Sequence, residues 1–254
     1  MPPTLGVKAY EELRSMLAHG RLEPGTQLVN RKLADEIGMS MTPVREAVTR
    51  LASEGLVEHV PGAGAFVRRI SRQELAELYD VRQALEPLAA ACAAQHATAA
   101  ETAEMREIVT DSFRIIRGIA ASTRGHADTR QMTAWLEGDR RFHEIVFRAS
   151  RNRWLSKIAI DLKLLAFGFS PQRRLPHLLT VAAAVTTWRS HRRLLRALAR
   201  RDGAAAERIV REHVVMGKKE VFSRLTADGD LQPTEGEAAP GRPRQQRPRT
   251  HRRR

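Results

Sequence analysis

Asp139 and His143 stand four residues apart in the stretch EGDRRFHEIVF, residues 137–147. In a helix this spacing puts both side chains on one face, close to Leu136 and Phe147. A carboxylate and an imidazole on an apolar face need polar partners, because burying them without any costs free energy. The pair alone is compatible with a structural ion pair, with the start of a catalytic site, or with two ligands of a metal ion.

Two further histidines, His191 and His213, recur at helical spacing with apolar residues. The stripe of His191 comprises Ala184, Trp188, Leu195 and Leu198, and that of His213 comprises Ala206, Ile209 and Met216. A single buried histidine is ordinarily satisfied by a backbone carbonyl, whereas three histidines and an aspartate on three inward faces favour one shared cation. Asp139, His143, His191 and His213 are therefore predicted to bind a divalent metal ion. Their chemistry suits Zn²⁺, Ni²⁺, Mn²⁺ or Fe²⁺.

A metal ion beside histidines could also activate water, so a metal-dependent helical enzyme fused to a DNA-binding module is an alternative. The chain lacks the His-Glu-x-x-His motif of metal hydrolases, because Phe147 stands where the second histidine would be. It shows no serine or cysteine in a recognisable nucleophile setting and no glycine-rich phosphate loop. We therefore expect no enzyme and no catalytic residues.

The candidate ligands fall in a middle region that reads as helix after helix. Ser71 followed by Glu74 resembles a capping box that opens a helix ending near His96. Further helices are predicted over residues 101–119, 128–149, 153–169, 176–200 and 204–225. Such a run predicts an antiparallel, all-helical bundle over residues 71–225.

Residues 5–70 combine short helices with a glycine-punctuated, β-like piece. One amphipathic helix is predicted over residues 5–19 and a second over 30–37, each followed by glycine. Thr42 is expected to cap a third helix with Pro43 at its first position, where a missing N–H costs nothing. Two helices joined by a short glycine turn predict a helix-turn-helix.

The third helix buries Val44, Ala47, Val48 and Leu51 and leaves Arg45, Thr49 and Arg50 outside. After it, LVEHVPGAGAFVRR predicts two short strands around a turn at Gly62 and Gly64, which would form a wing. Taken singly, Arg45 and Arg50 would be assigned to a solvated helix face; helix pair, cap and wing together favour DNA binding. The predicted fold class is mainly α, with a winged helix-turn-helix domain before the bundle.

Amino-acid composition constrains the function less tightly than the motifs do. The formal net charge is +14, but residues 238–254 hold seven arginines and no acid, and residues 1–70 carry a net charge of only +1. Residues 226–254 are rich in Pro, Gly, Gln and Arg and are expected to form a disordered basic tail. Cys92 is the only cysteine, which suits a reducing cytoplasm. Neither a signal segment nor a membrane-spanning apolar run is present, so a cytoplasmic, nucleoid-associated protein is expected.

The stretch GRLEPGTQLVNRKLADEIGMSMTPVREAVTRLASEGLVEHVPGAGAFV resembles the winged helix-turn-helix of the GntR family of bacterial transcription regulators, including PG, LA, TPVREA, RL and GLV. The resemblance implies that Arg31 and Arg45 contact DNA. Gly62 would approach the minor groove, and Thr42 would contact a phosphate. The family often has arginine where Met41 stands, and the tip PGAG lacks the basic residue frequently found in the wing.

The stretches YDVRQALEPLAAACAA, DRRFH and SHRRLLRALARRDGAAAERIVREHV resemble the effector-binding domain of the FadR branch of that family, called FCD. In its metal-binding members the ligands follow the pattern Asp-x-x-x-His, then His, then a His 22 residues later. Asp139, His143, His191 and His213 match this pattern. The resemblance implies a homodimer that binds double-stranded, pseudo-palindromic operator DNA, usually as a repressor relieved by an effector.

The implied effector is a small organic acid whose carboxylate completes the coordination of the metal. Arg82 and Arg140 are candidates to clamp it, although a surface position is expected for Arg140. Effector binding would favour one arrangement of the dimer and so change its affinity for DNA. A regulator whose metal is purely structural, with the effector elsewhere, is the remaining alternative.

Deleting residues 238–254 should weaken non-specific DNA binding and flatten its salt dependence, because each arginine that neutralises a phosphate adds to the salt slope. The slope of log affinity against log salt concentration, measured for the full chain and the truncated one, checks this expectation. An unchanged slope would assign the tail to solubility or processing.

Overall fold

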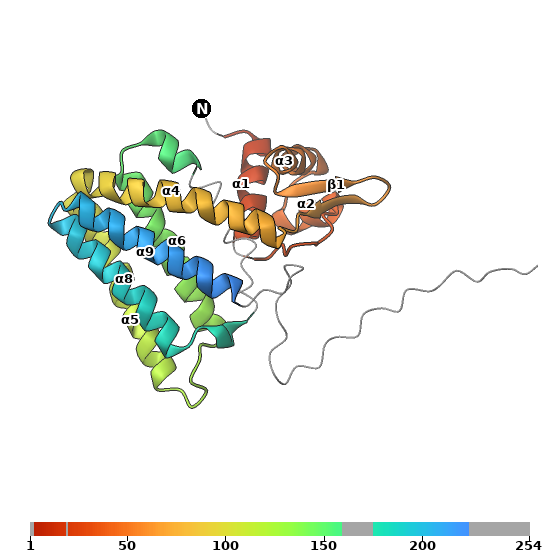
Figure 1. Cartoon of the computed structure of the whole chain (residues 1–254). Helices are drawn as coiled ribbons and strands as arrows, with labels where there is room; N and C mark the ends of the chain where they lie inside the picture. The colour runs from red at the N-terminus through yellow and green to blue at the C-terminus, as the bar shows by residue number, and fades with distance from the viewer. Residues whose placement is uncertain (1–2, 19, 159–174, 224–254) are drawn as a thin grey trace, which may run out of the picture.

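The structure is a computed structural model that describes residues 3–18, 20–158 and 175–223. A small winged helix-turn-helix lies at one end of a larger helical bundle (Figure 1). The predicted fold class, mainly α with a wing, is confirmed. The predicted basic tail at 226–254 lies outside the described residues, as does most of the helix predicted over 153–169, of which residues 153–158 are helical.

The N-terminal unit contains three helices and a two-stranded sheet. These are α1 (Leu5–Ala18), α2 (Asn30–Ile37), α3 (Met41–Ser53), β1 (Val57–Val60) and β2 (Gly64–Val67). The strands are antiparallel, with Val57 opposite Val67. Leu13 of α1 and Leu51 of α3 are fully buried in the core of this unit, so α1 forms the surface against which α3 is set.

Thr42 does not cap α3, contrary to the sequence prediction. The helix begins at Met41, and Ser40 in an extended conformation precedes it without a side-chain capping bond. Thr42 and Pro43 therefore lie within the first turn, where backbone N–H groups have no intrahelical partner and a proline costs no hydrogen bond. The position of Pro43 is compatible with either start, so sequence alone could not separate them.

A segment before α2 completes the wing. Gly25 N–H donates to the carbonyl of Val67 at 2.8 Å, and Leu28 N–H donates to that of Ala65 at 2.8 Å. Gln27 Nε2 donates to the carbonyl of Ala63 near the tip at 2.7 Å. This bracing was not predicted, because the pairing joins residues that are distant in sequence.

Within residues 71–158 and 175–223, which the structure describes, the bundle contains five long helices, one 3-10 turn and the short helical piece at 153–158. The long helices and the turn are α4 (Arg72–His96), α5 (Ala99–Ala120), α6 (Thr129–Ala149), η2 (Pro176–Leu178), α8 (Val181–Ala199) and α9 (Gly203–Phe222). Figure 1 shows α4 running from the winged unit along the bundle, with α9 beside it. Phe142, Met105 and Leu194 are fully or almost fully buried in the shared core.

Capping boxes fix where several helices begin. The predicted box of Ser71 and Glu74 is confirmed. A second box, Thr98 with Glu101, starts α5 at Ala99, two residues before the predicted start. Each box satisfies two backbone N–H groups that the first turn would otherwise leave without a partner.

The single helix predicted over residues 176–200 is wrong. A 3-10 turn ends at Leu178, and Thr180 caps α8 by accepting from Ala183 N–H at 3.3 Å. The intervening Leu179 is held by Ala127, whose N–H donates to its carbonyl at 3.0 Å. This contact joins residues that are far apart in sequence, so the helical periodicity of residues 176–200 could not predict it.

The inward stripe of α9 also differs from the prediction at one position. Met216, placed inward with His213, is 42% exposed. Gly217 instead faces Tyr79 of α4, and an added Cβ there would lie 3.9 Å from its ring. Within the described part of the chain, no helix is long and apolar enough to cross a membrane.

Glu101 is expected to stabilise the bundle in a pH-dependent manner. Its hydrogen bond to Arg151 and the backbone bond at Thr98 lower its pKa to about 2. This stabilisation is complete above the ordinary carboxyl pKa and is lost as pH falls towards 2. Glu101→Gln should lower the free energy of unfolding by about 1–3 kcal/mol at pH 7.

Urea unfolding at pH 7 and at pH 3 measures the effect, and the difference between variant and wild type should shrink at pH 3. Glu207→Gln removes the carboxylate of an exposed pair with Arg211, so it should change stability by less than about 0.5 kcal/mol. A loss for Glu101→Gln that is the same at both pH values would contradict this assignment.

Candidate metal centre

Three helices bring the four predicted ligands together in the bundle. Asp139 and His143 come from α6, His191 from α8 and His213 from α9. One potential ligand atom from each side chain lies within 4.8 Å of all the others. His143 and His191 are buried, and Asp139 and His213 are partly buried.

The three imidazoles surround a common point. The ring centroids of His143, His191 and His213 are 5.4 Å apart in every pair. Asp139 Oδ1 lies 3.4 Å from His191 Nε2 and 3.8 Å from His143 Nε2. These separations exceed the roughly 2.7–2.9 Å of a charge-assisted hydrogen bond. They are close to the roughly 3.4 Å between two ligands that are each about 2.1 Å from one tetrahedral ion. The donor set and its spacing thus fit a divalent metal.

Packing orients the ring of His191. Phe142, the neighbour of His143 in α6, stacks on it with centroids 4.0 Å apart and an angle of 15° between the rings. Phe142 is completely buried, so its own position is fixed by the core. A ligand held in this way loses little further conformational entropy when it binds an ion.

Electrostatics keeps the third histidine neutral. Burial, and next the neighbouring His191, lower the pKa of His213 to about 4. A neutral imidazole retains the lone pair that coordinates a metal. His213 is therefore in the protonation state of a metal ligand at neutral pH.

Two charged residues of α4, Arg82 and Glu86, lie against this cluster, and both are buried. Arg82 Nε donates to Glu86 Oε1 at 2.6 Å, and Glu86 Oε2 is 3.8 Å from His143 Nδ1. Burial alone would lower the pKa of Arg82, but the Glu86 carboxylate outweighs this, and the pKa is raised above its ordinary value. Glu86 was not predicted from the sequence, although a signal existed: it continues the buried stripe of Leu75, Tyr79 and Arg82 at helical spacing.

Arg140, the other candidate clamp, has a different environment. Its guanidinium pairs with Glu137 at 2.6 Å and with Glu144, both on its own helix. These bonds hold the partly buried side chain against its own helix. Of the two arginines considered from sequence, the structure brings Arg82 to the cluster.

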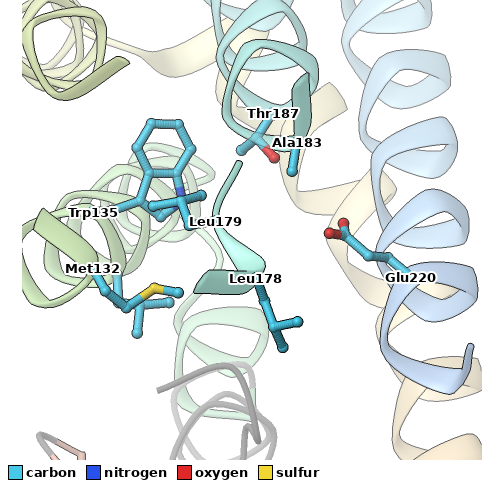
Figure 2. A pocket seen from close by; sticks show the side chains of 8 residues that line it. Met132, Trp135, Leu178, Leu179, Ala183, Thr187 and Glu220 are labelled. Carbon is cyan, nitrogen blue, oxygen red and sulfur yellow. The ribbon is translucent and has the colours of Figure 1, made fainter. Parts of the chain in front are cut away.

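A small cavity of about 50 Å³ lies about one helical turn from the cluster along α6 and α8, and Figure 2 shows its lining. Its walls come from α6, η2, α8 and α9, and comprise Met132, Trp135, Leu136, Leu178, Leu179, Ala183, Thr187 and Glu220. Trp135 and Thr187 each precede a ligand by four residues, which is about 6 Å along a helix. In Figure 2 the Glu220 side chain extends from α9 toward the other lining residues. Most of the lining residues are apolar, but Thr187 and the carboxylate of Glu220 also give the cavity a polar wall.

The residues predicted to contact DNA lie on the surface of the N-terminal unit. Arg31 on α2, Thr42 and Arg45 on α3, and Gly62 in the wing turn are all exposed. Gly62 has a φ of 75°, a conformation that favours glycine. Together they place one basic side chain on each helix of the pair and a small residue at the wing tip.

Arg50, which the sequence pattern also predicted to lie outside the buried face of α3, points toward α1. Its guanidinium lies 3.7 Å from the centroid of the Tyr10 ring and its Nε is 3.3 Å from Glu54 Oε1. The hydroxyl of Tyr10 donates to the same carboxylate at 2.8 Å. This cluster attaches α3 to α1, a role that sequence spacing does not reveal.

The two regions match two known families. Residues 5–67 match the bacterial regulatory proteins of the gntR family, and residues 77–215, more than half of the chain, match the FCD domain. The chain belongs to the GntR family and carries an FCD domain. Its assignment to the FadR branch in particular stays a prediction.

Relatives of this GntR-family chain are regulators. A probable D-xylose utilization operon transcriptional repressor from Paenarthrobacter nicotinovorans is 31% identical over 200 residues, which cover 78% of this chain and 80% of that protein. The HTH-type transcriptional regulator McbR from Escherichia coli (strain K12) is 34% identical over 106 residues, which cover 42% of this chain and 48% of McbR. The match thus spans about half the length of McbR.

Solved structures support the same fold. The structure of E. coli McbR/YncC has a TM-score of 0.74 and 24% sequence identity, and the match covers 87% of this chain and 98% of that one. Because the matched family and these relatives consist of transcription regulators, the expectation of a regulator rather than an enzyme is confirmed.

The purified GntR-family protein should contain about one divalent ion per chain. Elemental analysis after purification without chelator checks this expectation, and His191→Ala should reduce the content well below one. His96→Ala, which removes an exposed histidine at the end of α4, is the matched control and should keep the metal. A metal-free wild type would rule out the centre.

Proposed function

We propose that the chain is a ligand-responsive transcriptional repressor that binds a pseudo-palindromic operator as a dimer and senses a small organic acid at a metal-containing pocket. The observation that carries the proposal is the convergence of three imidazoles and one carboxylate about one helical turn from a cavity, in a chain whose other unit exposes the first turn of α3. The first feature supports sensing, and the second supports DNA binding.

For DNA binding, the proposal relies on the first turn of α3. Thr42 and Arg45 are exposed there, at the positive end of the helix dipole, where phosphate groups are bound favourably. A recognition helix in the major groove reads bases with its N-terminal residues. Arg45 would therefore contact a base edge or phosphate, with Arg31 against the DNA nearby and the wing turn at Gly62 near the minor groove.

For effector binding, the proposal relies on Arg82, the metal ligands and the cavity. When bound, a divalent ion held by Asp139, His143 and the two other histidines would offer remaining coordination positions to a carboxylate. The buried guanidinium of Arg82 supplies positive charge close to this point. A ligand with its acid group here would place its other end in the cavity.

The cavity limits the ligand further. A volume of about 50 Å³ exceeds the roughly 10–15 Å³ that one water needs, so it admits a few solvent molecules or a short organic group. Glu220 on its wall would repel a second carboxylate. The geometry therefore favours a compact acid whose far end is apolar or donates hydrogen bonds.

The two activities would be coupled through α4. Its middle carries Arg82 and Glu86 at the cluster, while Glu74 in its first turn pairs with Arg68, which directly follows β2 of the wing. A ligand that prefers one arrangement of α4 against its neighbours would shift the placement of the two winged units in a dimer. DNA affinity would then change by the difference in ligand binding energy between the two arrangements.

Arg45→Ala should weaken specific operator binding by about 1–3 kcal/mol, or ten- to hundred-fold, because it removes a contact of the recognition helix. Binding to the native promoter region, measured by footprinting and titration, tests this. Arg106→Ala removes the same charge from the exposed face of α5 in the bundle and should bind normally. An Arg45→Ala protein with an unchanged footprint would defeat the DNA-binding assignment.

A further inference from the structure

The two ring nitrogens of His143 face two different carboxylates. Nε2 is 3.8 Å from Asp139 Oδ1, within the cluster, and Nδ1 is 3.8 Å from Glu86 Oε2, on α4. The side chains of His143 and Glu86 are each only 4% exposed. If Nε2 coordinates a metal, Nδ1 must carry the proton, and an acceptor beside Nδ1 favours that tautomer.

Glu86 is itself held in place by Arg82. Arg82 Nε donates to Oε1 at 2.6 Å, so the two carboxylate oxygens have separate neighbours, the guanidinium and the imidazole. The guanidinium carbon lies 4.7 Å from the centroid of the Tyr79 ring, which covers it. The positive charge of Arg82 balances the negative charge of the buried Glu86 carboxylate, which would otherwise be costly to bury.

We propose that Glu86 is a positioning residue of the metal centre. Its Oε2 lies 3.8 Å from His143 Nδ1 and, in the metal-loaded protein, would move closer to accept a hydrogen bond from Nδ1–H and so present Nε2 to the ion, while Arg82 fixes the orientation of the carboxylate. The proposal rests on the metal centre described under the proposed function. A simple buried ion pair would need only the Arg82 contact, whereas here the second oxygen is directed at a ligand ring.

The first test is Zn²⁺ affinity, measured at a fixed pH by competition with a chelator. Glu86→Gln keeps the shape of the side chain but removes its charge, and loss of such a partner typically costs ten- to hundred-fold in metal affinity. The variant should still reach about one ion per chain at saturating Zn²⁺, because all four ligands remain.

Glu101→Gln is the matched control. Glu101 is also a buried carboxylate bonded to an arginine, Arg151, but it lies at the start of α5. This variant loses an acid–arginine pair of the same bundle and should keep wild-type Zn²⁺ affinity. Weakening in both variants to the same extent would attribute the effect to general destabilisation and overturn the proposal.

The possible outcomes distinguish failure of the metal centre from failure of the role of Glu86. A wild type that binds no Zn²⁺ would remove the metal centre itself. A wild type that binds Zn²⁺, with Glu86→Gln within twofold of it, would leave the centre standing and overturn the role of Glu86.

A further test uses only the wild-type protein, so it does not depend on whether a variant folds. In the Zn²⁺-loaded protein, the Nδ1–H proton of His143 should give an observable, slowly exchanging NMR signal, since a buried carboxylate accepts it. Absence of that signal, with the other ligand histidines assigned, would also overturn the role of Glu86.

Discussion

The structure depends on how a helical bundle accommodates an acid and three histidines at its centre. Asp139, His143, His191 and His213 meet where α6, α8 and α9 pack together, next to residues such as Phe142 that are completely buried. An uncompensated buried charge costs several kcal/mol, which is a large part of the roughly 5–15 kcal/mol that stabilises a whole domain. A shared cation at the proposed metal centre would turn this cost into a cross-link between three helices.

The same need to compensate buried charge accounts for the two charged residues that α4 places against the cluster. Arg82 and Glu86 bring a matched pair of charges to the edge of the cluster, and the first turn of α4 pairs with the wing through Glu74 and Arg68. A single helix therefore contacts both the proposed metal centre and the DNA-binding unit. Under the proposed function, α4 would connect an effector-dependent change in the bundle directly to the wing.

Sequence reasoning succeeded where a signal is local. The four-residue spacing of Asp139 and His143, and the capping box at Ser71, depend only on helix geometry, and the structure has both. It failed where tertiary contacts and backbone conformation decide. The helix predicted over 176–200 is interrupted at Leu179, whose carbonyl accepts from Ala127 N–H, and the choice between Ser40 and Thr42 depends on backbone conformation. Glu86 was missed for another reason, because its partner across the bundle, His143, is 57 residues away in sequence.

The most direct test of the central claim is anomalous X-ray diffraction from crystals of the metal-loaded protein, collected on both sides of the absorption edge of the bound metal. The account predicts one strong anomalous peak per chain, within about 2.0–2.2 Å of an Asp139 oxygen and of one nitrogen from each of His143, His191 and His213. A peak elsewhere, or none at these four side chains in a protein saturated with metal, would contradict it.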